Sequence, residues 1–204
     1  SSVDSEPSTE LWSERDIVLI TYADQVRSQG VSALRAQLDF LTTHQLDEVI
    51  AAVHLLPFCP YTSDDGFSVT DYLAVDPDSG SWDDIAKIGE SFDLMFDLVL
   101  NHASQKHDWF QRFLKGDPEY ADFFIDQDPS ADLSKVVRPR SLPLLTPFES
   151  DQGLKHIWTT FSADQVDLNY ANPSVMLAML QTLVECARRG ARIIRFDAIA
   201  FLWK

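Results

Sequence analysis

Four short apolar runs, separated by segments with helical spacing, constrain the fold of this chain more than any other feature. The runs are rich in aliphatic and β-branched residues, which predicts buried strands over residues 16–22, 49–56, 93–100 and 191–196. The segments with helical spacing lie at residues 32–44, 82–89, 109–114 and 174–189. Strands that are apolar along their whole length and alternate with helices are typical of a parallel sheet covered on both faces. Four such units fit either an open doubly wound α/β sheet or half of an eight-stranded α/β barrel.

A nucleotide-binding doubly wound fold is disfavoured by the first predicted turn. The sequence Tyr22-Ala23-Asp24-Gln25 follows the first strand and contains none of the glycines that a phosphate-binding turn needs. Hydrophobic residues make up 45% of the chain, which is sufficient for one domain with a sizeable core. No run approaches the roughly 18 apolar residues of a membrane helix.

The net charge indicates which classes of partner to expect, and the cysteine content indicates the cellular compartment. The chain carries 32 acidic and 16 basic residues, a formal net charge of −16. Such a field repels nucleic acid and anionic membranes, so we expect neither as a partner, and an anionic substrate would need Arg or Lys gathered locally. The two cysteines, Cys59 and Cys186, lack metal-ligand spacing, and residues 1–10 lack the features of a signal peptide. A cytoplasmic protein is therefore predicted.

The pattern divides the chain into four parts. Residues 1–15 form a small, polar, acidic tail that we expect to be disordered or processed, and residues 16–119 hold three β/α units. Residues 120–170 are irregular and too long for a simple connection, which predicts an insertion that forms a small subdomain. Residues 171–204 add a helix and the fourth strand before the chain stops.

Three of the predicted strands are followed by, or end in, residues whose side chains could take part in binding or catalysis. Asp64 lies in the loop after the second strand, Asp97 and His102 lie at the end of the third, and Arg195 and Asp197 end the fourth. Ligands of parallel α/β folds bind beyond the carboxyl ends of the strands. We therefore predict one site, at this rim, that combines carboxylates, an imidazole and a guanidinium.

Arg195 and Asp197 are two residues apart, so on a strand their side chains point to the same side. A guanidinium beside a carboxylate lowers the pKa of that carboxylate by roughly 1–3 units. A low pKa suits a nucleophile, which must be ionised. A buried ion pair that closes the sheet is equally compatible with this spacing, and the two interpretations stay open at this stage.

Two segments resemble the signature motifs of glycoside hydrolase family 13, the α-amylase superfamily. Asp97-Leu98-Val99-Leu100-Asn101-His102 resembles its D-x-V-x-N-H segment, and Arg195-Phe196-Asp197-Ala198 resembles its R-x-D-A nucleophile segment. Other segments resemble the sucrose-phosphorylase-like branch, which includes sucrose, glucosylglycerate and glucosylglycerol phosphorylases; they are residues 54–58, 63–69, 80–84, 137–140 and 161–169. Residues 142–148 and 199–204 look more like the glucosylglycerate and glucosylglycerol enzymes. The resemblance spans residues 16–204 and implies the N-terminal half of a (β/α)8 TIM barrel, with an irregular insertion after the third strand.

The resemblance also implies roles for individual residues. Asp197 would be the nucleophile that forms a covalent glucosyl-enzyme, and Arg195 would keep it ionised. Four other residues would bind the sugar. Asp64 and His102 would hydrogen-bond with its hydroxyls, Phe67 would give it an apolar wall, and Asp97 would belong to the polar network under it. His54 lies outside the motifs and is predicted to be a core histidine satisfied by the backbone.

Arg138 and Arg140 flank Pro139 in the predicted insertion, in a chain that is otherwise strongly negative. If phosphate relieves the glucosyl-enzyme, a cationic clamp is required, and this pair is placed to supply one. The alternative is that both arginines pair with neighbouring acids such as Asp132 or Glu149. The resemblance implies no metal and no cofactor, so Asn101, a calcium ligand in many amylases, would brace its loop.

The function predicted from the sequence is transfer of glucose from a small α-glucoside to phosphate by a retaining phosphorylase. A retaining mechanism needs a second carboxyl group about 5–5.5 Å from the first, and the family supplies it from a later strand. We therefore expect the 204 residues alone to be inactive, and their open strand edges to pair with a second copy or with a missing C-terminal half. The alternatives are a hydrolase or transglucosidase of the same family, and a non-catalytic half-barrel binding module.

Overall fold

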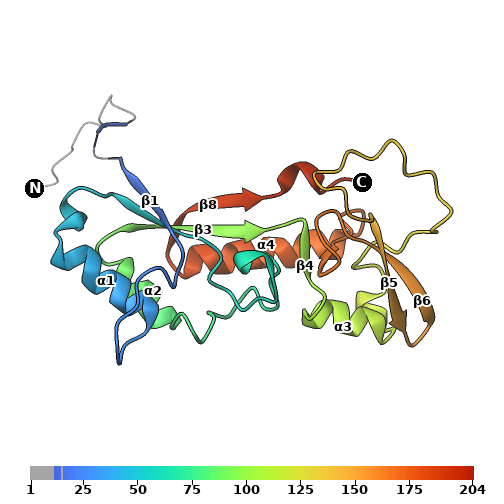
Figure 1. The fold of residues 1–204 in the computed structure, drawn as a ribbon, viewed down its shortest axis with the longest axis horizontal. Helices are drawn as coiled ribbons and strands as arrows, with labels where there is room; N and C mark the ends of the chain where they lie inside the picture. Colours follow the sequence, from blue (N-terminus) through green and yellow to red (C-terminus); the bar gives the residue numbers. More distant parts are fainter. Residues whose placement is uncertain (1–11, 15) are drawn as a thin grey trace, which may run out of the picture.

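Four parallel strands form the central sheet of the computed structural model, which describes residues 12–14 and 16–204 (Figure 1). The strands are β1 (Val18–Thr21), β2 (Ala52–Leu55), β3 (Asp93–Val99) and β8 (Ala191–Asp197), in the order β1-β2-β3-β8. All four predicted strands are therefore confirmed as parallel neighbours. The tail predicted over residues 1–15 lies largely outside the described residues.

The four predicted helices are also present, and local sequence accounts for where they begin. They are α1 (Ala33–Thr43), α2 (Trp82–Ile88), α3 (Asp108–Leu114) and α4 (Pro173–Arg188), with short 3-10 turns η1 (Leu46–Glu48), η2 (Asp64–Gly66), η3 (Pro118–Tyr120) and η4 (Ile199–Phe201). Ser32 caps α1 by accepting the Arg35 amide, and Ser81 forms a reciprocal capping box with Asp84 at α2. Pro173 occupies the first turn of α4, where no amide donor is needed. None of the helices in the described ranges is long and apolar enough to cross a membrane.

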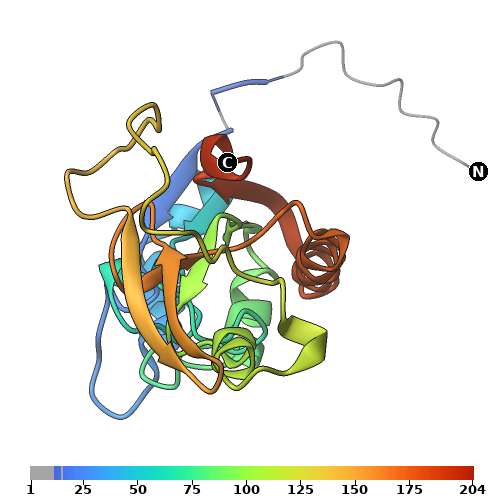
Figure 2. The ribbon, with the colours of Figure 1, turned by 90° about the vertical axis from the view of Figure 1, so that its right-hand side faces the viewer.

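One face of the sheet packs against α1, α2 and α4, and the other face carries none of these helices (Figure 2). Side chains on the packed face, such as Leu34, Val53 and Ile85, are fully buried. On the opposite face Ile20 is 64% exposed and Ile193 is 41% exposed. The expectation that both faces are covered is therefore wrong for the described residues, because the strands curve as part of a barrel wall. In a closed barrel this inner face is covered by further strands rather than by helices.

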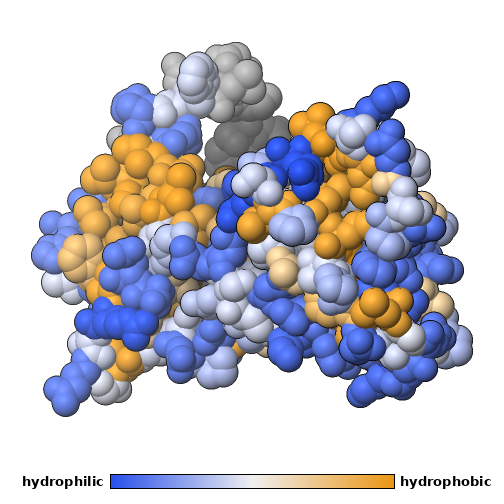
Figure 3. Space-filling view, turned by 45° about the vertical axis from the view of Figure 1, so that its right-hand side comes forward, coloured by the Kyte–Doolittle hydropathy of each residue, from blue (hydrophilic) through white to orange (hydrophobic). Residues whose placement is uncertain are grey.

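Apolar side chains also reach the surface beside the last strand. On α4, Met176, Leu180 and Val184 share one side of the helix and are each about half exposed, and Phe196 of β8 is 42% exposed. Figure 3 shows apolar residues gathered in broad patches on one side of the molecule. Contiguous patches of this kind mark surfaces that pack against another element.

Antiparallel pairing organises the segment predicted to be irregular. β5 (Leu145–Ser150) and β6 (Gly153–Trp158) form a hairpin, and β7 (Gln165–Asp167) pairs with β4 (His102–Ser104), which directly follows β3. The prediction of irregular structure throughout is therefore wrong. Gly153, which has a φ of 108°, ends the turn of the hairpin and was the available signal. The β4–β7 pair fastens this segment to the carboxyl end of the sheet.

A separate cluster of buried residues, rich in aromatic side chains, supports the carboxyl end of the sheet. Phe110 of α3 is fully buried and makes edge-to-face contacts with Phe124 and with Phe148 of β5. Tyr170 donates a hydrogen bond to the Leu100 carbonyl at 2.8 Å, immediately after β3. The ends of β3 and β4 are therefore held by a core of their own.

Three successive residues of the loop after β2 adopt left-handed backbone conformations. The φ angles are 57° for Asp64, 49° for Asp65 and 101° for Gly66. A Cβ atom at position 66 would lie 2.6 Å from the Pro57 carbonyl oxygen, so the loop packs tightly on the end of β2. This conformation is costly for residues with a side chain and requires support from its surroundings.

Replacing Gly66 with Ala is expected to destabilise the protein by at least about 3 kcal/mol, because backbone strain adds to a clash with Pro57. Gly30 provides the matched control, since its φ is 84° and a Cβ atom added there would meet no other atom within 4 Å. Gly30→Ala should cost about 1–2 kcal/mol, the backbone contribution alone. Urea unfolding of both variants tests this, and equal losses would contradict the tight packing of the loop.

Candidate active site

A row of charged and polar side chains crosses the inner face of the sheet at its carboxyl end. Asp97 of β3 has a fully buried side chain, and its Oδ2 lies 2.7 Å from His54 Nε2 on β2. Its Oδ1 accepts a hydrogen bond from Arg195, which pairs with it in register on β8. The other guanidinium nitrogen, Arg195 Nη2, lies 3.2 Å from Asp197 Oδ1. Adjacent strands thus connect His54, Asp97, Arg195 and Asp197 in one chain of contacts.

His54 corrects one expectation from the sequence. It was predicted to be satisfied by the backbone, whereas its partner is the Asp97 carboxylate, and its Nδ1 has no partner among the described residues. His54 and Asp97 occupy neighbouring strands and face the same side of the sheet. The strand register, which the sequence alone does not supply, was needed to find this contact.

The pKa of Asp197 also differs from the expectation. Burial raises it above its ordinary value, and the nearby Arg195 only partly offsets this effect. Asp97 contributes in the same direction as burial, because a second negative charge disfavours ionisation. Arg195 thus acts in the predicted direction, but the prediction of a lowered pKa for Asp197 is wrong, because burial outweighs the guanidinium, which also donates a hydrogen bond to Asp97.

His102 is almost fully buried, and its partners determine its protonation. The Asn101 side-chain amide lies 3.2 Å from His102 Nδ1, and His102 Nε2 lies 3.1 Å from the Phe67 carbonyl oxygen. An amide donor at Nδ1 and a carbonyl acceptor at Nε2 correspond to the neutral ring with its proton on Nε2. Burial lowers the pKa of His102, in agreement with a neutral imidazole.

These strand ends surround a pocket of about 320 Å³. Its lining consists of Tyr22, Asp64, Asp65, Phe67, His102, Arg140, Phe161, Gln165 and Asp197. The structure thus brings together five of the residues singled out from the sequence, while Asp97 and Arg195 lie beneath the pocket. A hollow of about 330 Å³ shares Tyr22 and Asp65 with it but lacks Asp197 and His102, so we place the candidate site in the former.

Four residues of the lining, Tyr22, Asp65, Phe161 and Gln165, received no role from the sequence. Tyr22 directly follows β1. The rings of Phe161 and His102 have centroids 5.1 Å apart, and Gln165 donates to Asp64 Oδ2 at 2.8 Å. Gln165 Nε2 also lies 3.2 Å from His102 Nε2, but both nitrogens carry protons in the assigned tautomer, so this is a contact and not a hydrogen bond. Residue type alone gave no signal for Phe161 and Gln165, because their placement depends on the β4–β7 pairing.

The two arginines of the insertion have different positions. Arg140 lines the pocket, where its Nη2 lies 3.5 Å from Asp64 Oδ1, and it remains about half exposed. Arg138 instead donates to the Leu142 carbonyl at 2.9 Å and does not line the pocket. The acid paired with Arg140 is therefore Asp64 of the pocket. It is neither Asp132 nor Glu149, the sequence neighbours considered as alternative partners.

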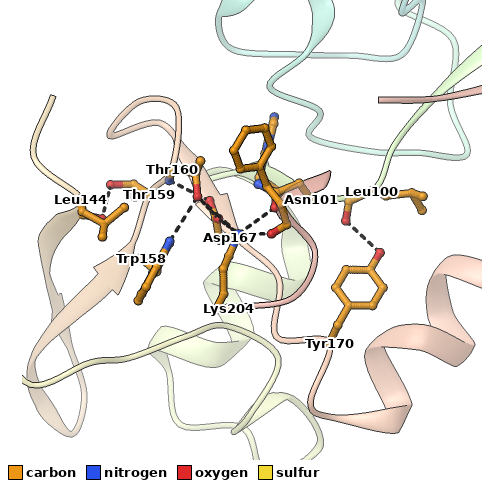
Figure 4. A network of polar contacts seen from close by, with 11 residues as sticks. Leu100, Asn101, Leu144, Trp158, Thr159, Thr160, Asp167, Tyr170 and Lys204 are labelled. Atoms are coloured by element: carbon orange, nitrogen blue, oxygen red, sulfur yellow. Dashed lines mark hydrogen bonds and ion pairs between the residues drawn. The ribbon is translucent and has the colours of Figure 1, made fainter. Parts of the chain in front are cut away.

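The Lys204 ammonium lies next to Asn101, which contacts the His102 ring. The Lys204 ammonium is 2.6 Å from Asp167 Oδ2, 2.8 Å from Asn101 Oδ1 and 3.3 Å from Thr160 Oγ1 (Figure 4). The Asp167 side chain is fully buried, so its charge needs this partner. Asn101 therefore links the ammonium to the His102 ring. The described part of the chain contains no group of three or more His, Cys, Asp or Glu side chains that could hold a metal ion.

Comparisons with known proteins agree with the motifs. The family model of the alpha-amylase catalytic domain matches residues 30–204. The chain is 57% identical to the glucosylglycerate phosphorylase of Spirochaeta thermophila over 93% of its own length and 32% of that protein, and 55% identical to the Allomeiothermus silvanus enzyme of the same name over 95% and 35%. It therefore spans about a third of the length of these relatives.

The fold of this chain also agrees with that of a solved phosphorylase structure. The structure of the sucrose 6F-phosphate phosphorylase from Thermoanaerobacter thermosaccharolyticum superposes with a TM-score of 0.84 at 31% identity, covering 95% of this chain and 42% of that one. The resemblance inferred from Asp97–His102 and Arg195–Ala198 is confirmed, and so is the partial (β/α)8 barrel. This chain belongs to the alpha-amylase family, as part of its catalytic domain.

Proposed function

We propose that this chain provides the nucleophile-bearing half of a retaining glycoside phosphorylase, which transfers glucose from a small α-glucoside to phosphate. The observation that carries the proposal is the presence of Asp197 and Arg140 in one pocket of a chain with a net charge of −16. A carboxylate serves the first step of such a reaction, and a guanidinium serves an anionic second substrate. The names of the relatives support phosphorolysis, since they are phosphorylases.

In the first step the Asp197 carboxylate attacks the anomeric carbon of the glucosyl group. The bond from that carbon to the leaving oxygen breaks, and a carboxylic acid protonates the leaving oxygen. A phosphate oxygen then attacks the same carbon, releases Asp197 and gives glucose 1-phosphate. The acid is expected from a later strand of the barrel, so the 204 residues by themselves would not complete this cycle.

The sugar is held by the polar and aromatic lining of the pocket. Asp64 presents carboxylate oxygens to hydroxyl donors, while Phe67 and Phe161 offer apolar surface to the ring. His102 is neutral, with its Nε2 proton directed at the Phe67 carbonyl and close to the pocket. Pockets that combine apolar walls with a few fixed polar groups are typical of small-ligand sites.

Arg140 is proposed as the phosphate contact. Its only ion pair within the described residues is the 3.5 Å contact with Asp64, and its side chain is 49% exposed, so an incoming anion can reach the guanidinium. Arg138 is proposed to act through the loop, because its bond to the Leu142 carbonyl braces residues 138–142. Neither role requires a cofactor or a metal, and the Lys204 ammonium already neutralises Asp167.

The compartment is proposed to be the cytoplasm. Cys59 and Cys186 are both free thiols in the structure, and burial raises the pKa of the Cys186 thiol to about 11, which makes it unreactive. Free, buried thiols fit a reducing environment.

A rival function is hydrolysis or transglucosylation by the same nucleophile, with water or a sugar as the acceptor. Arg140→Ala separates the possibilities in an active barrel, obtained by joining this chain to the segment that follows the matched region in the Spirochaeta thermophila relative. Removing the guanidinium should raise the KM for phosphate by about tenfold or more, because a charge-assisted hydrogen bond contributes roughly 1.5–3 kcal/mol. Formation of the glucosyl-enzyme, trapped with a fluorinated glucoside, should persist.

Arg138→Ala is the comparison, since it removes the same charge from the same loop, and Arg138 itself does not line the pocket. We expect a much smaller rise in the KM for phosphate from this variant. Equal effects of both substitutions would show that Arg140 acts only through net charge or loop stability. Unchanged phosphate dependence in Arg140→Ala would refute its role as the phosphate contact, and the absence of any phosphate dependence would favour the hydrolase.

The raised pKa of Asp197 predicts a stability effect that is independent of catalysis. Its ionised form is disfavoured by folding, so this carboxylate destabilises the protein at neutral pH and ceases to do so once protonated. Asp197→Asn should therefore increase the free energy of unfolding at pH 7, and the gain should vanish at about pH 3, where the carboxyl is protonated in both states. Arg195 keeps Asp97 as its partner in this variant. Urea unfolding across this pH range measures the gain, and a loss of stability at pH 7 would contradict the direction of the shift.

A further inference from the structure

The loop that carries Asp64 and Phe67 into the pocket is strained, and its own sequence does not remove the strain. Asp64 and Asp65 both have positive φ angles, a conformation that costs about 1–3 kcal/mol for each residue with a side chain. Within the loop, Phe67 donates to the Asp64 carbonyl at 3.0 Å and Thr62 donates to the Ser68 carbonyl at 3.1 Å. Backbone bonds of this kind close the loop, but a loop in this conformation persists only when further contacts determine it.

Asp164 supplies such contacts from the far side of the insertion. Its Oδ2 accepts hydrogen bonds from Thr62 Oγ1 at 2.5 Å, Ser63 Oγ at 2.5 Å and Ser68 Oγ at 2.7 Å. These three hydroxyls lie on both sides of the left-handed residues, 96 to 102 positions away in the sequence. One carboxylate oxygen therefore holds both ends of the loop.

The position of Asp164 is itself fixed. Gln105, just after β4, donates its backbone amide to the Asp164 carbonyl at 2.8 Å, and β7 begins at the next residue, Gln165. Gln165 also donates to Asp64 Oδ2, so the same segment reaches the loop at a second point. The anchor is thus built into the β4–β7 pair and does not depend on the mobile end of a long side chain.

We propose that Asp164 is a positioning residue that latches the loop of residues 62–68 onto the insertion and thereby sets the place of Asp64 and Phe67 in the pocket. The effect on catalysis rests on the proposed function, whereas the latch itself does not. Thr62, Ser63, Ser68 and Asp164 do not line the pocket. They are therefore separate from the residues proposed to touch the sugar.

The ionisation state of Asp164 favours strong hydrogen bonds to its three hydroxyl partners. Burial raises the pKa of Asp164, but the hydroxyls of Ser63, Thr62 and Ser68 outweigh this effect and leave the pKa below its ordinary value. The carboxylate is therefore ionised at neutral pH. Hydrogen bonds to an ionised acceptor are roughly twice as strong as those between neutral groups.

Hydrogen exchange of the 204-residue chain tests the latch without any ligand. In Asp164→Asn and Asp164→Ala, amides of residues 62–68 should exchange at least about tenfold faster, as expected when charge-assisted hydrogen bonds are lost. Peptides covering α4 and the β5–β6 hairpin should exchange as in the parent chain. The isosteric Asn variant guards against a fold defect in the Ala variant.

Asp128→Asn and Asp128→Ala are the matched controls, because Asp128 lies in the same insertion and also accepts a serine hydroxyl, that of Ser130 at 2.7 Å. Its hydrogen bonds stay within its own turn and do not reach the loop, so exchange at residues 62–68 should stay unchanged. Unchanged exchange in both Asp164 variants, or faster exchange everywhere in the chain, would overturn the latch.

A double-mutant cycle with Ser68→Ala adds a second criterion. If Asp164 and Ser68 act as one unit, the double variant should exchange no faster at residues 62–68 than Asp164→Ala alone. Additive acceleration would contradict the latch.

In the joined, active barrel, Asp164→Ala should lower kcat/KM for the glucoside by about tenfold or more, and Asp128→Ala should leave it unchanged. If no variant and no parent turns over, the proposed function fails, while the exchange data still decide the latch.

Discussion

The buried carboxylate of Asp97 is the interaction on which the site depends. Its side chain is fully buried, and an unpaired charge there would cost several kcal/mol. His54 and Arg195 satisfy its two oxygens from the strands on either side. Because β2, β3 and β8 are parallel neighbours and Asp97 lies opposite Arg195, this pairing links the three strands across the inner face of the sheet and sets the direction of Arg195. The geometry at Asp197 follows from that direction.

The division of Arg195 between two carboxylates has a chemical consequence. A guanidinium committed to Asp97 can offset only part of the burial of Asp197, so the pKa of Asp197 is raised. A carboxylate that its surroundings stabilise less binds a proton more readily, and by the same reasoning it binds an electrophilic carbon more readily. In the proposed mechanism, the contact between Asp97 and Arg195 thus affects the reactivity of Asp197 as well as its position. The stability lost to a desolvated charge is a common feature of functional sites.

The sequence was sufficient for the elements that local patterns determine. The helix from Ala33 begins at the capping serine, and Pro173 marks the start of α4, because caps act within a few residues. The motif residues Asp97, His102 and Asp197 were found because strand ends converge on one rim. His54 and Gln165 were missed, since their partners lie on other elements and only the register reveals them. The pKa of Asp197 was predicted in the wrong direction because Arg195 is visible in the sequence, whereas the burial that outweighs it depends on the fold.

The insertion has a structural role that its irregular sequence conceals. The loop after β2 places Asp64 in the pocket through a backbone conformation that local contacts alone do not favour. Segments about 100 residues away in the chain supply the missing contacts, through the β4–β7 pair and through hydroxyls gathered on one carboxylate oxygen. A strained loop with a distant anchor can be altered by a change at either end. The shape of the candidate pocket therefore depends on the contact between the barrel strands and the insertion as well as on the motif residues.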